Sequence, residues 1–198
     1  MSLFNKTQLE GVARTRASLV RKSLSEIAAK EITESTTGVL LAKKYDIFLS
    51  HRYLDYIHII GLQKEITDLG LSVFVDWIVE PDLDRSEVSI RTADWLRSTM
   101  KRCQCLPYAF STNSSESKWM AWELGYSDAY HGKVAIIPIT DYDTHSNNYD
   151  YSGEEYLKLY PYVTIANDTT GTKRLWIHTS PKTYISLLGW LDGKEPHT

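Results

Sequence analysis

Short apolar runs that alternate with segments of helical periodicity constrain this chain more than any other feature. Four of these runs have the length and composition of strands that are buried on both faces, and they are residues 47–49, 71–75, 103–110 and 134–139. Apolar residues at helical spacing fill the intervals between them. The alternation predicts an α/β fold with a mostly parallel sheet, right-handed crossovers and helices on both faces.

Local sequence signals place the ends of the predicted helices. The first covers residues 53–69, with Gly70 just after its C-cap. The second covers residues 88–100, and Ser114 or Ser115 is expected to cap the third.

Prolines and turn residues mark departures from this alternation. Pro107 lies inside the third predicted strand, where it cannot donate to a ladder, so we expect a bulge there. Further on, strands over residues 162–165 and 174–178 flank a gap rich in turn residues, 168–171, which predicts a hairpin. Pro181 is expected to open a last helix.

The N-terminal part differs from the rest in pattern and in charge. Residues 5–31 have helical spacing and residues 33–38 have the composition of a linker. We therefore expect an N-terminal helical extension with its linker, residues 1–43, followed by the main domain, residues 44–198.

Charge limits the partners that this chain can take. Its formal net charge is −3, made of +4 over residues 1–44 and −7 over the remainder. A slightly acidic chain is a poor candidate for nucleic-acid binding by broad phosphate neutralisation. The basic N-terminal segment is expected to dock on the acidic domain, with docking on another chain or an anionic surface as the alternatives.

The cysteines and apolar segments indicate a cytoplasmic protein. Cys103 and Cys105 are the only cysteines and have no second pair to complete a zinc site, so we expect reduced packing residues and no metal. The sequence has neither the apolar core of a signal peptide nor a run long enough to cross a bilayer, and we expect no membrane partner.

The fold class points to a candidate site. Ligands of open parallel sheets bind outside the carboxyl ends of the strands, at the switch point in strand order. Ser50, His51 and Arg52 follow the first predicted strand, and Asp76 and Trp77 follow the second. Arg52 could bind a phosphate through two N–H groups, and His51 or Trp77 could stack on a base.

A carboxylate on the third helix completes this candidate site. Glu123 lies four residues after Trp119 and therefore on the same helix face. A carboxylate beside an aromatic ring could hold ribose hydroxyls or stabilise an oxocarbenium ion, as carboxylates do in glycoside hydrolysis. Each residue also has a simpler interpretation: Glu123 as a solvated helix residue, Trp119 as a core aromatic, His51 and Arg52 as exposed loop residues, and Asp76 as a turn cap.

Several common enzyme motifs are absent from the sequence. It contains no G-x-G-x-x-G, no P-loop and no G-x-S-x-G elbow, and its histidines are scattered. These absences argue against an ordinary dehydrogenase, an NTPase, a serine hydrolase and a zinc enzyme.

Three segments, in the right order, resemble the TIR domain family. Tyr45–His51 resembles the first box of the family, and Gly70–Asp76 resembles its second strand. Ser117-x-Trp119-x-x-x-Glu123-Leu124 resembles the helix motif of TIR enzymes that cleave NAD. The resemblance covers residues 44–140 and implies a flavodoxin-like sheet. Bacterial TIR proteins of Thoeris-type antiphage systems are similar in size and also diverge from the ordinary TIR ending.

The resemblance also implies an activity. Glu123 takes the place of the catalytic glutamate, and Ser50, His51 and Arg52 fall where the family contacts the nucleotide. The implied substrate is NAD+, with no further cofactor, and cleavage of its nicotinamide N-glycosidic bond would make a cyclic ADP-ribose-type signal for a separate effector protein. Self-association through the TIR domain on activation is also implied.

Two other functions remain open at this point. The chain could be a non-catalytic module that binds other TIR domains. It could also be a nucleoside or nucleotide glycosyl transferase of related architecture, which would use Glu123 near a ribose but explains the segment Tyr45–His51 less well.

Overall fold

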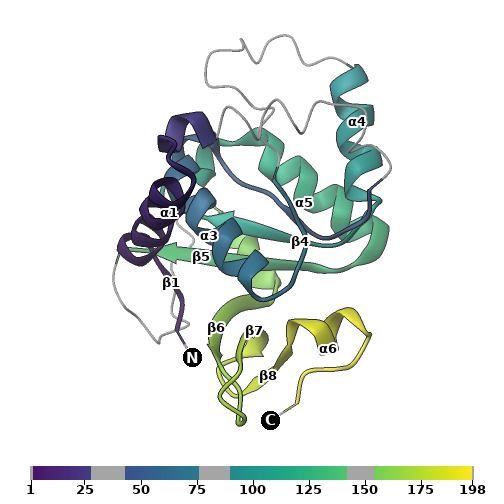
Figure 1. Ribbon diagram of the computed structural model, residues 1–198. Coiled ribbons are helices and arrows are strands. Elements are labelled where there is room, and N and C mark those ends of the chain that lie inside the picture. The colour runs from purple at the N-terminus through teal and green to yellow at the C-terminus, as the bar shows by residue number, and fades with distance from the viewer. Residues whose placement is uncertain (1, 28–42, 76–89, 142–153, 198) are drawn as a thin grey trace.

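The computed structural model describes residues 2–27, 43–75, 90–141 and 154–197. Its centre is a parallel sheet with helices on both faces (Figure 1). The four central strands run in the order β3-β2-β4-β5, and their bounds are β2 (Tyr45–Leu49), β3 (Val73–Val75), β4 (Cys103–Phe110) and β5 (Val134–Thr140). This is the flavodoxin-like order, whose switch point lies between β2 and β4. The predicted fold class is confirmed.

Three helices connect these strands: α3 (Tyr56–Asp68), α4 (Ile90–Met100) and α5 (Lys118–His131). Gly70 follows α3 with a φ of +84°, as predicted for the residue after a C-cap. The expected start of α4 at residue 88 lies outside the described residues. The predicted cap of α5 is wrong, because Ser114 begins a separate 3-10 turn, η3 (Ser114–Glu116), and Ser117 caps the helix by accepting from Met120 N at 3.4 Å.

Consecutive residues of β2 enter two different cores. Ile47 and Leu49 pack in a cluster with residues of α1 and α3, whereas Phe48 packs in a second cluster with residues of α4 and α5. All three side chains are fully buried. Short parallel strands covered on both faces lack polar alternation for this reason, so the apolar run of β2 was sufficient to predict it.

Pro107 causes no bulge, and that expectation is wrong. The register between β2 and β4 is the same on either side of it, from Tyr45–Cys103 to the bridge between Ser50 and Tyr108. Pro107 has no N–H to donate, so it interrupts the hydrogen bonds between the two strands without shifting their alignment.

The N-terminal segment adds a strand and a helix to the domain. β1 (Phe4–Asn5) pairs in parallel with the end of β5, and α1 (Lys6–Val20) packs against α3. The helix expected over residues 5–31 is wrong in extent, because Arg21 adopts a φ of 53° and ends α1. The expected linker, residues 33–38, lies outside the described residues.

The C-terminal part extends the sheet with antiparallel strands, which lie at the bottom of Figure 1. The predicted hairpin is confirmed as β6 (Tyr162–Asn167) and β7 (Lys173–Ser180). Pro181 does not open a helix. It lies in the turn before β8 (Thr183–Ser186), and the last helix, α6 (Leu187–Leu191), begins after its N-cap Ser186. A further 3-10 turn, η4 (Glu155–Leu159), precedes β6.

The structure also bears on what the sequence predicts for the cysteines and for membrane-spanning helices. Cys103 and Cys105 are buried free thiols, and burial raises the pKa of Cys103 to about 12. Over the described residues, no helix combines the length and the apolar character needed to cross a membrane.

Candidate active site

Ser50 and Glu123 meet at the switch point of the sheet. Ser50 follows the carboxyl end of β2, and its Oγ donates a hydrogen bond to Glu123 Oε2 at 2.6 Å. Both residues are buried, with exposed fractions of 0% and 3%. The structure therefore brings together two of the residues predicted for the site, from segments 73 positions apart in the sequence.

The face of α5 that turns toward the sheet carries Glu123. Its buried residues are spaced by three or four positions, as on one side of a helix, and they are Met120, Glu123, Leu124 and Ser127. Glu123 therefore occupies a position in an otherwise largely apolar stripe, and the alternative expectation of a solvated helix residue is wrong. A buried carboxylate is costly unless it is hydrogen-bonded, and Ser50 supplies one such bond.

The loops after β2 and β4 are joined through Asp55. This residue is 2% exposed, and its carboxylate accepts hydrogen bonds from Ser111 Oγ and from Asn113 Nδ2, the latter at 2.7 Å. Burial alone would raise the pKa of Asp55, but the nearby His58 and the hydrogen bonds from Ser111 and Asn113 outweigh it and hold this pKa below its ordinary value. Asp55 is therefore an anionic link between the two loops.

Arg52 makes a second link between the same loops. Its Nη1 donates to the carbonyl oxygen of Asn113 and lies 2.6 Å from Glu116 Oε2. Its side chain is only 14% exposed, so the expectation of an exposed loop residue is wrong. The guanidinium was predicted to bind a phosphate, and in this structure it binds Asn113 and Glu116 instead.

His51 points into the protein interior. It is buried, and its Nδ1 lies 3.2 Å from the carbonyl oxygen of Leu49. Burial lowers the pKa of His51 to about 4, so the ring is neutral at pH 7. This placement overturns the alternative of an exposed loop histidine.

Trp119 lies half-buried on α5, one turn before Glu123. Its ring packs edge-on against Trp122, with centroids 5.3 Å apart, and both rings contact the cluster beneath α4 and α5. Asp76 and Trp77, the other two residues predicted for the site, lie outside the described residues.

Sequence reasoning missed three buried polar residues around this site. Asp55 connects the two loops, while Tyr108 on β4 donates a hydrogen bond to Glu154. Asp55 lies directly before a helix, where a local pattern would assign it to capping, but its side chain makes no capping bond there. Glu154 lies in a segment without any periodic pattern.

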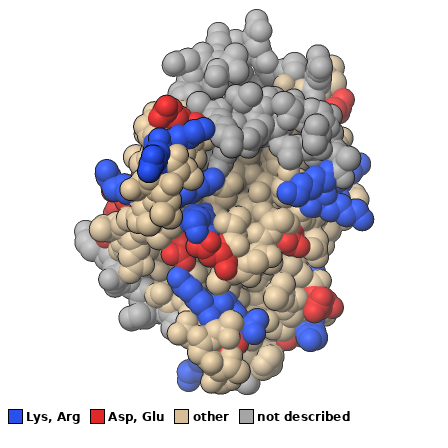
Figure 2. Space-filling view, viewed as in Figure 1, with Lys and Arg blue, Asp and Glu red and all other residues tan. Residues whose placement is uncertain are grey.

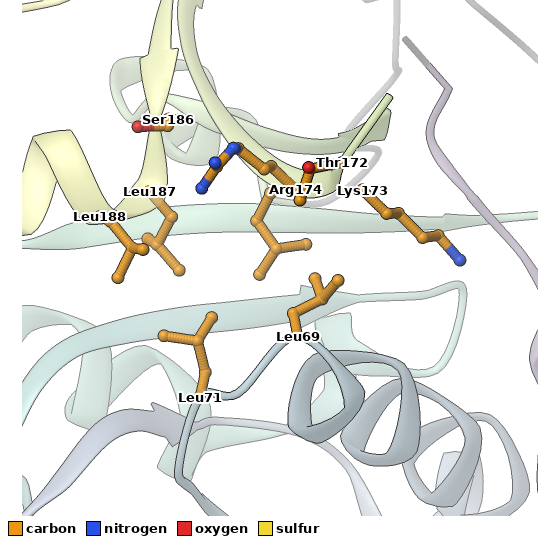
Figure 3. Close-up of a pocket in the computed structure, with 9 residues that line it drawn as sticks. Leu69, Leu71, Thr172, Lys173, Arg174, Ser186, Leu187 and Leu188 are labelled. Carbon is orange, nitrogen blue, oxygen red and sulfur yellow. The ribbon is translucent and has the colours of Figure 1, made fainter. Parts of the chain in front are cut away.

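Two cavities lie at the opposite edge of the sheet. The one in Figure 3 has a volume of about 80 Å³, and Leu69 and Leu71 face Leu187 and Leu188 across it. A second cavity of about 350 Å³ is lined by residues 44–46 and 101–104, at the amino ends of β2 and β4. None of the described residues that line these two cavities is one predicted for the site.

Charges of both signs mix on the surface. On the face shown in Figure 2, most basic side chains adjoin acidic ones, and they do not form one extended basic surface. Exposed or partly exposed pairs such as Lys64–Asp68 and Lys173–Glu65 contribute to the mixing of charges in the described chain.

Comparison with known proteins adds two relatives, although no protein-family profile matches the chain. A probable 3′ cyclic ADP-D-ribose synthase, ThsB′ of Bacillus cereus (strain MSX-D12), is 50% identical over 170 residues, which are 83% of this chain and 84% of that protein. A candidate cyclic ADP-D-ribose synthase, TIR2 of Cytobacillus dafuensis, is 35% identical over 100 residues, which are 50% of this chain and 26% of that longer protein. With a flavodoxin-like sheet, a Ser50–Glu123 contact at its switch point and a relative matched over most of both lengths, the chain belongs to the family of Thoeris-type TIR proteins.

Proposed function

We propose that this chain consumes NAD+, cleaves the N-glycosidic bond between nicotinamide and ribose, and closes the remaining ADP-ribose into a cyclic isomer that signals in antiphage defence. The contact between Ser50 and Glu123 carries the proposal, because it puts a carboxylate at the ligand-binding edge of the sheet. Membership of a family whose named relatives are cyclic ADP-D-ribose synthases supports the same activity.

Glu123 is the proposed catalytic residue. As the glycosidic bond breaks, the bonding electrons leave with nicotinamide, which departs as a neutral molecule, and positive charge develops at the ribose C1′. A carboxylate held beside C1′ stabilises that charge. A nucleophile of the same substrate then forms the new bond to C1′, and a hydroxyl that attacks loses its proton. Attack by water would give linear ADP-ribose instead.

The other predicted residues have supporting roles in this proposal. Ser50 orients Glu123, and Arg52 binds the diphosphate once it leaves Glu116. Trp119 forms an aromatic wall one turn from the carboxylate, and His51, being neutral and buried, shapes the end of β2. Roles for Asp76 and Trp77 remain predictions from the sequence.

Access to Glu123 requires a change from the arrangement described above. An exposed fraction of 3% leaves no room for a ribose against the carboxylate. We therefore propose that self-association of the TIR domain opens the site, so that the resting chain is slow and the assembled chain is active. A separate effector protein would detect the product.

The same burial favours a second candidate function. A buried glutamate that accepts a hydrogen bond from Ser50 could be a purely structural feature of a module that only binds other TIR domains. Such a module would need neither NAD+ nor the negative charge of Glu123. The division into an N-terminal helical extension with its linker, residues 1–43, and a TIR-like domain, residues 44–198, stays a prediction under either function.

Nicotinamide release tests the proposal against this alternative. Wild type and Glu123→Gln are incubated with NAD+ over a range of protein concentrations, with Glu195→Gln, at an exposed position, as the matched control. The proposal expects release from wild type and the control, rising steeply with concentration, and none from Glu123→Gln. Absence of release from all three proteins would favour the binding module, and equal release from wild type and Glu123→Gln would contradict the catalytic role of Glu123. A panel of nucleosides offered in place of NAD+ tests the transferase alternative, and mass spectrometry of the products distinguishes cyclic from linear ADP-ribose.

A further inference from the structure

Glu154 is a second buried carboxylate on the α5 side of the sheet. It is 4% exposed and lies at the start of η4. Its Oε1 accepts hydrogen bonds from the hydroxyls of Tyr108 and Tyr156, and its Oε2 accepts one from Ser114 Oγ at 3.0 Å. Three hydroxyl donors from three segments of the chain therefore converge on one carboxylate.

Both tyrosines are suited to this role as donors. Burial, followed by the nearby carboxylate of Glu154, raises the pKa of Tyr156 to about 12. Burial and the hydrogen bond to Glu154 also raise the pKa of Tyr108 well above its ordinary value. Each hydroxyl therefore keeps its proton at neutral pH and continues to donate it.

The first of these contacts leads to Ser50. Tyr108 on β4 is the direct cross-strand partner of Ser50, since Ser50 N donates to Pro107 O at 3.0 Å and Ala109 N donates to Ser50 O at 2.9 Å. Directly paired residues of neighbouring strands place their side chains on the same face of the sheet. Glu154 thus holds the residue next to the serine that contacts Glu123.

The second contact leads to the start of α5. Ser114 is fully buried in η3, and its carbonyl oxygen accepts a hydrogen bond at 2.8 Å from the backbone N–H of Ser117, the N-cap of α5. Its hydroxyl lies within reach of two acceptors, Glu154 Oε2 at 3.0 Å and Ser111 O at 2.8 Å, and can donate to one at a time. Glu154 thus also contacts the turn from which the helix of Glu123 begins.

Resting on the function proposed above, we propose that Glu154 is a positioning residue for Glu123. It fixes the start of α5 against β4, through Ser114 and Tyr108, so that the carboxylate of Glu123 meets Ser50. Glu154 itself touches no substrate in this role. A displacement of about 1 Å at a reacting group can cost about 100-fold in rate, so the placement of α5 has a kinetic consequence.

Two substitutions at Glu154 separate its geometry from its charge. In Glu154→Gln, the amide oxygen can accept from both tyrosines and the amide nitrogen can donate to Ser114 Oγ, so α5 keeps its place. We expect kcat to stay within about twofold of wild type for Glu154→Gln and to fall about 10- to 100-fold for Glu154→Ala, with a smaller change in KM. Ser114→Ala, which removes one hydroxyl, is expected to lower kcat in the same direction and keeps the test usable if Glu154→Ala does not fold.

The control variant is Thr164→Val. It removes a buried hydrogen bond of 2.8 Å to His178, in the C-terminal hairpin away from α5. We expect Thr164→Val to lower the melting temperature and leave kcat unchanged. If Thr164→Val reduced kcat as much as Glu154→Ala, or if folded Glu154→Ala and Ser114→Ala both kept wild-type kcat, the positioning role would be wrong.

A second readout does not depend on catalysis. Hydrogen exchange at the first amides of α5 is expected to speed up in Glu154→Ala and Ser114→Ala but not in Thr164→Val. Unchanged exchange in the first two variants would contradict the positioning role. If no protein released nicotinamide while exchange changed as expected, the proposed enzymatic function would fail and the structural link from Glu154 to α5 would stand.

Discussion

Asp55 accepts a hydrogen bond of 2.5 Å from Ser111 Oγ and thereby joins the loops that follow β2 and β4. These loops flank the switch point of the sheet, where Ser50 meets Glu123. Asp55 precedes α3 but makes no side-chain cap for that helix, because its carboxylate is used across the gap between the loops. The carboxylate of Asp55 therefore links the two loops of the candidate site and does not cap α3.

Removing this carboxylate is expected to destabilise the protein. In Asp55→Ala, Ser111 and Asn113 lose their acceptor in a buried setting, at a cost of roughly 3 kcal/mol in the free energy of unfolding. Urea denaturation at pH 7 measures the change. Asp192→Ala, at an exposed position, is the control and should stay within about 0.5 kcal/mol of wild type. If wild type, Asp55→Ala and Asp192→Ala all unfolded at the same urea concentration, the structural role of Asp55 would be contradicted.

His51 makes stability depend on pH. The unfolded chain takes up its proton near the ordinary pKa of 6.5, whereas burial lowers the pKa in the folded state to about 4. Stability from this group is therefore complete above pH 6.5 and is lost as pH falls toward 4. Between pH 7 and pH 5 the loss is about 2 kcal/mol.

Comparison with His51→Asn isolates this effect. The asparagine amide can still donate to Leu49 O but takes up no proton, so its loss of stability over the same pH interval should be smaller by about 2 kcal/mol. Unfolding curves at pH 7 and pH 5 give both values. Substituting the exposed His197 by Gln provides the control. Parallel pH profiles for wild type and His51→Asn would show that His51 is not the group responsible.

Gly61 sets how closely α1 approaches α3. A Cβ at this buried position would lie 2.1 Å from the carbonyl oxygen of Leu9, a backbone atom that cannot move aside on its own. Gly61→Ala should therefore push the helices apart and destabilise the protein by about 1–3 kcal/mol. Gly11→Ala on α1, where no atom lies within 4 Å of the added Cβ, should instead stabilise it by up to about 1 kcal/mol. The melting temperature of each variant measures the change. If both melting temperatures shifted in the same direction from that of wild type, the described packing of α1 on α3 would be contradicted.

The pair Arg52–Glu116 offers a test of how the substrate is bound. If Arg52 binds the diphosphate of NAD+ after leaving Glu116, Glu116→Gln should lower KM by a few-fold, because the competing carboxylate charge is gone. Arg52→Ala should raise KM in the same assay. If KM changed in neither variant, Arg52 would have no part in substrate binding and would serve only to link the loops through Asn113.

The sequence was sufficient to predict those helices and strands whose surroundings in the fold are the same along their whole length. β2 is buried on both faces, so its apolar run needed no knowledge of its partners, and the order of the strands and helices followed from their alternation. Glu123 could be grouped with Trp119 on one helix face because the two residues are four positions apart. In each of these cases the local signal and the tertiary environment agree.

Where tertiary contacts decide, the sequence was not sufficient. α1 ends at Arg21 although apolar spacing continues beyond it, and Pro107 is accommodated in β4 by an interrupted ladder instead of a bulge. Asp55 and Glu154 bind partners on other segments of the chain, 56 positions away for Ser111 and 46 for Tyr108. A single sequence carries no local signal for such pairs.

The central claim is that the carboxylate of Glu123 drives cleavage of NAD+. In the direct test, wild type and Glu123→Gln are incubated with NAD+ at protein concentrations high enough for self-association, and free nicotinamide is measured over time. The folded fraction of each protein is checked first. The account predicts steady release by wild type and none above background by Glu123→Gln. Release at the same rate from both proteins would contradict it.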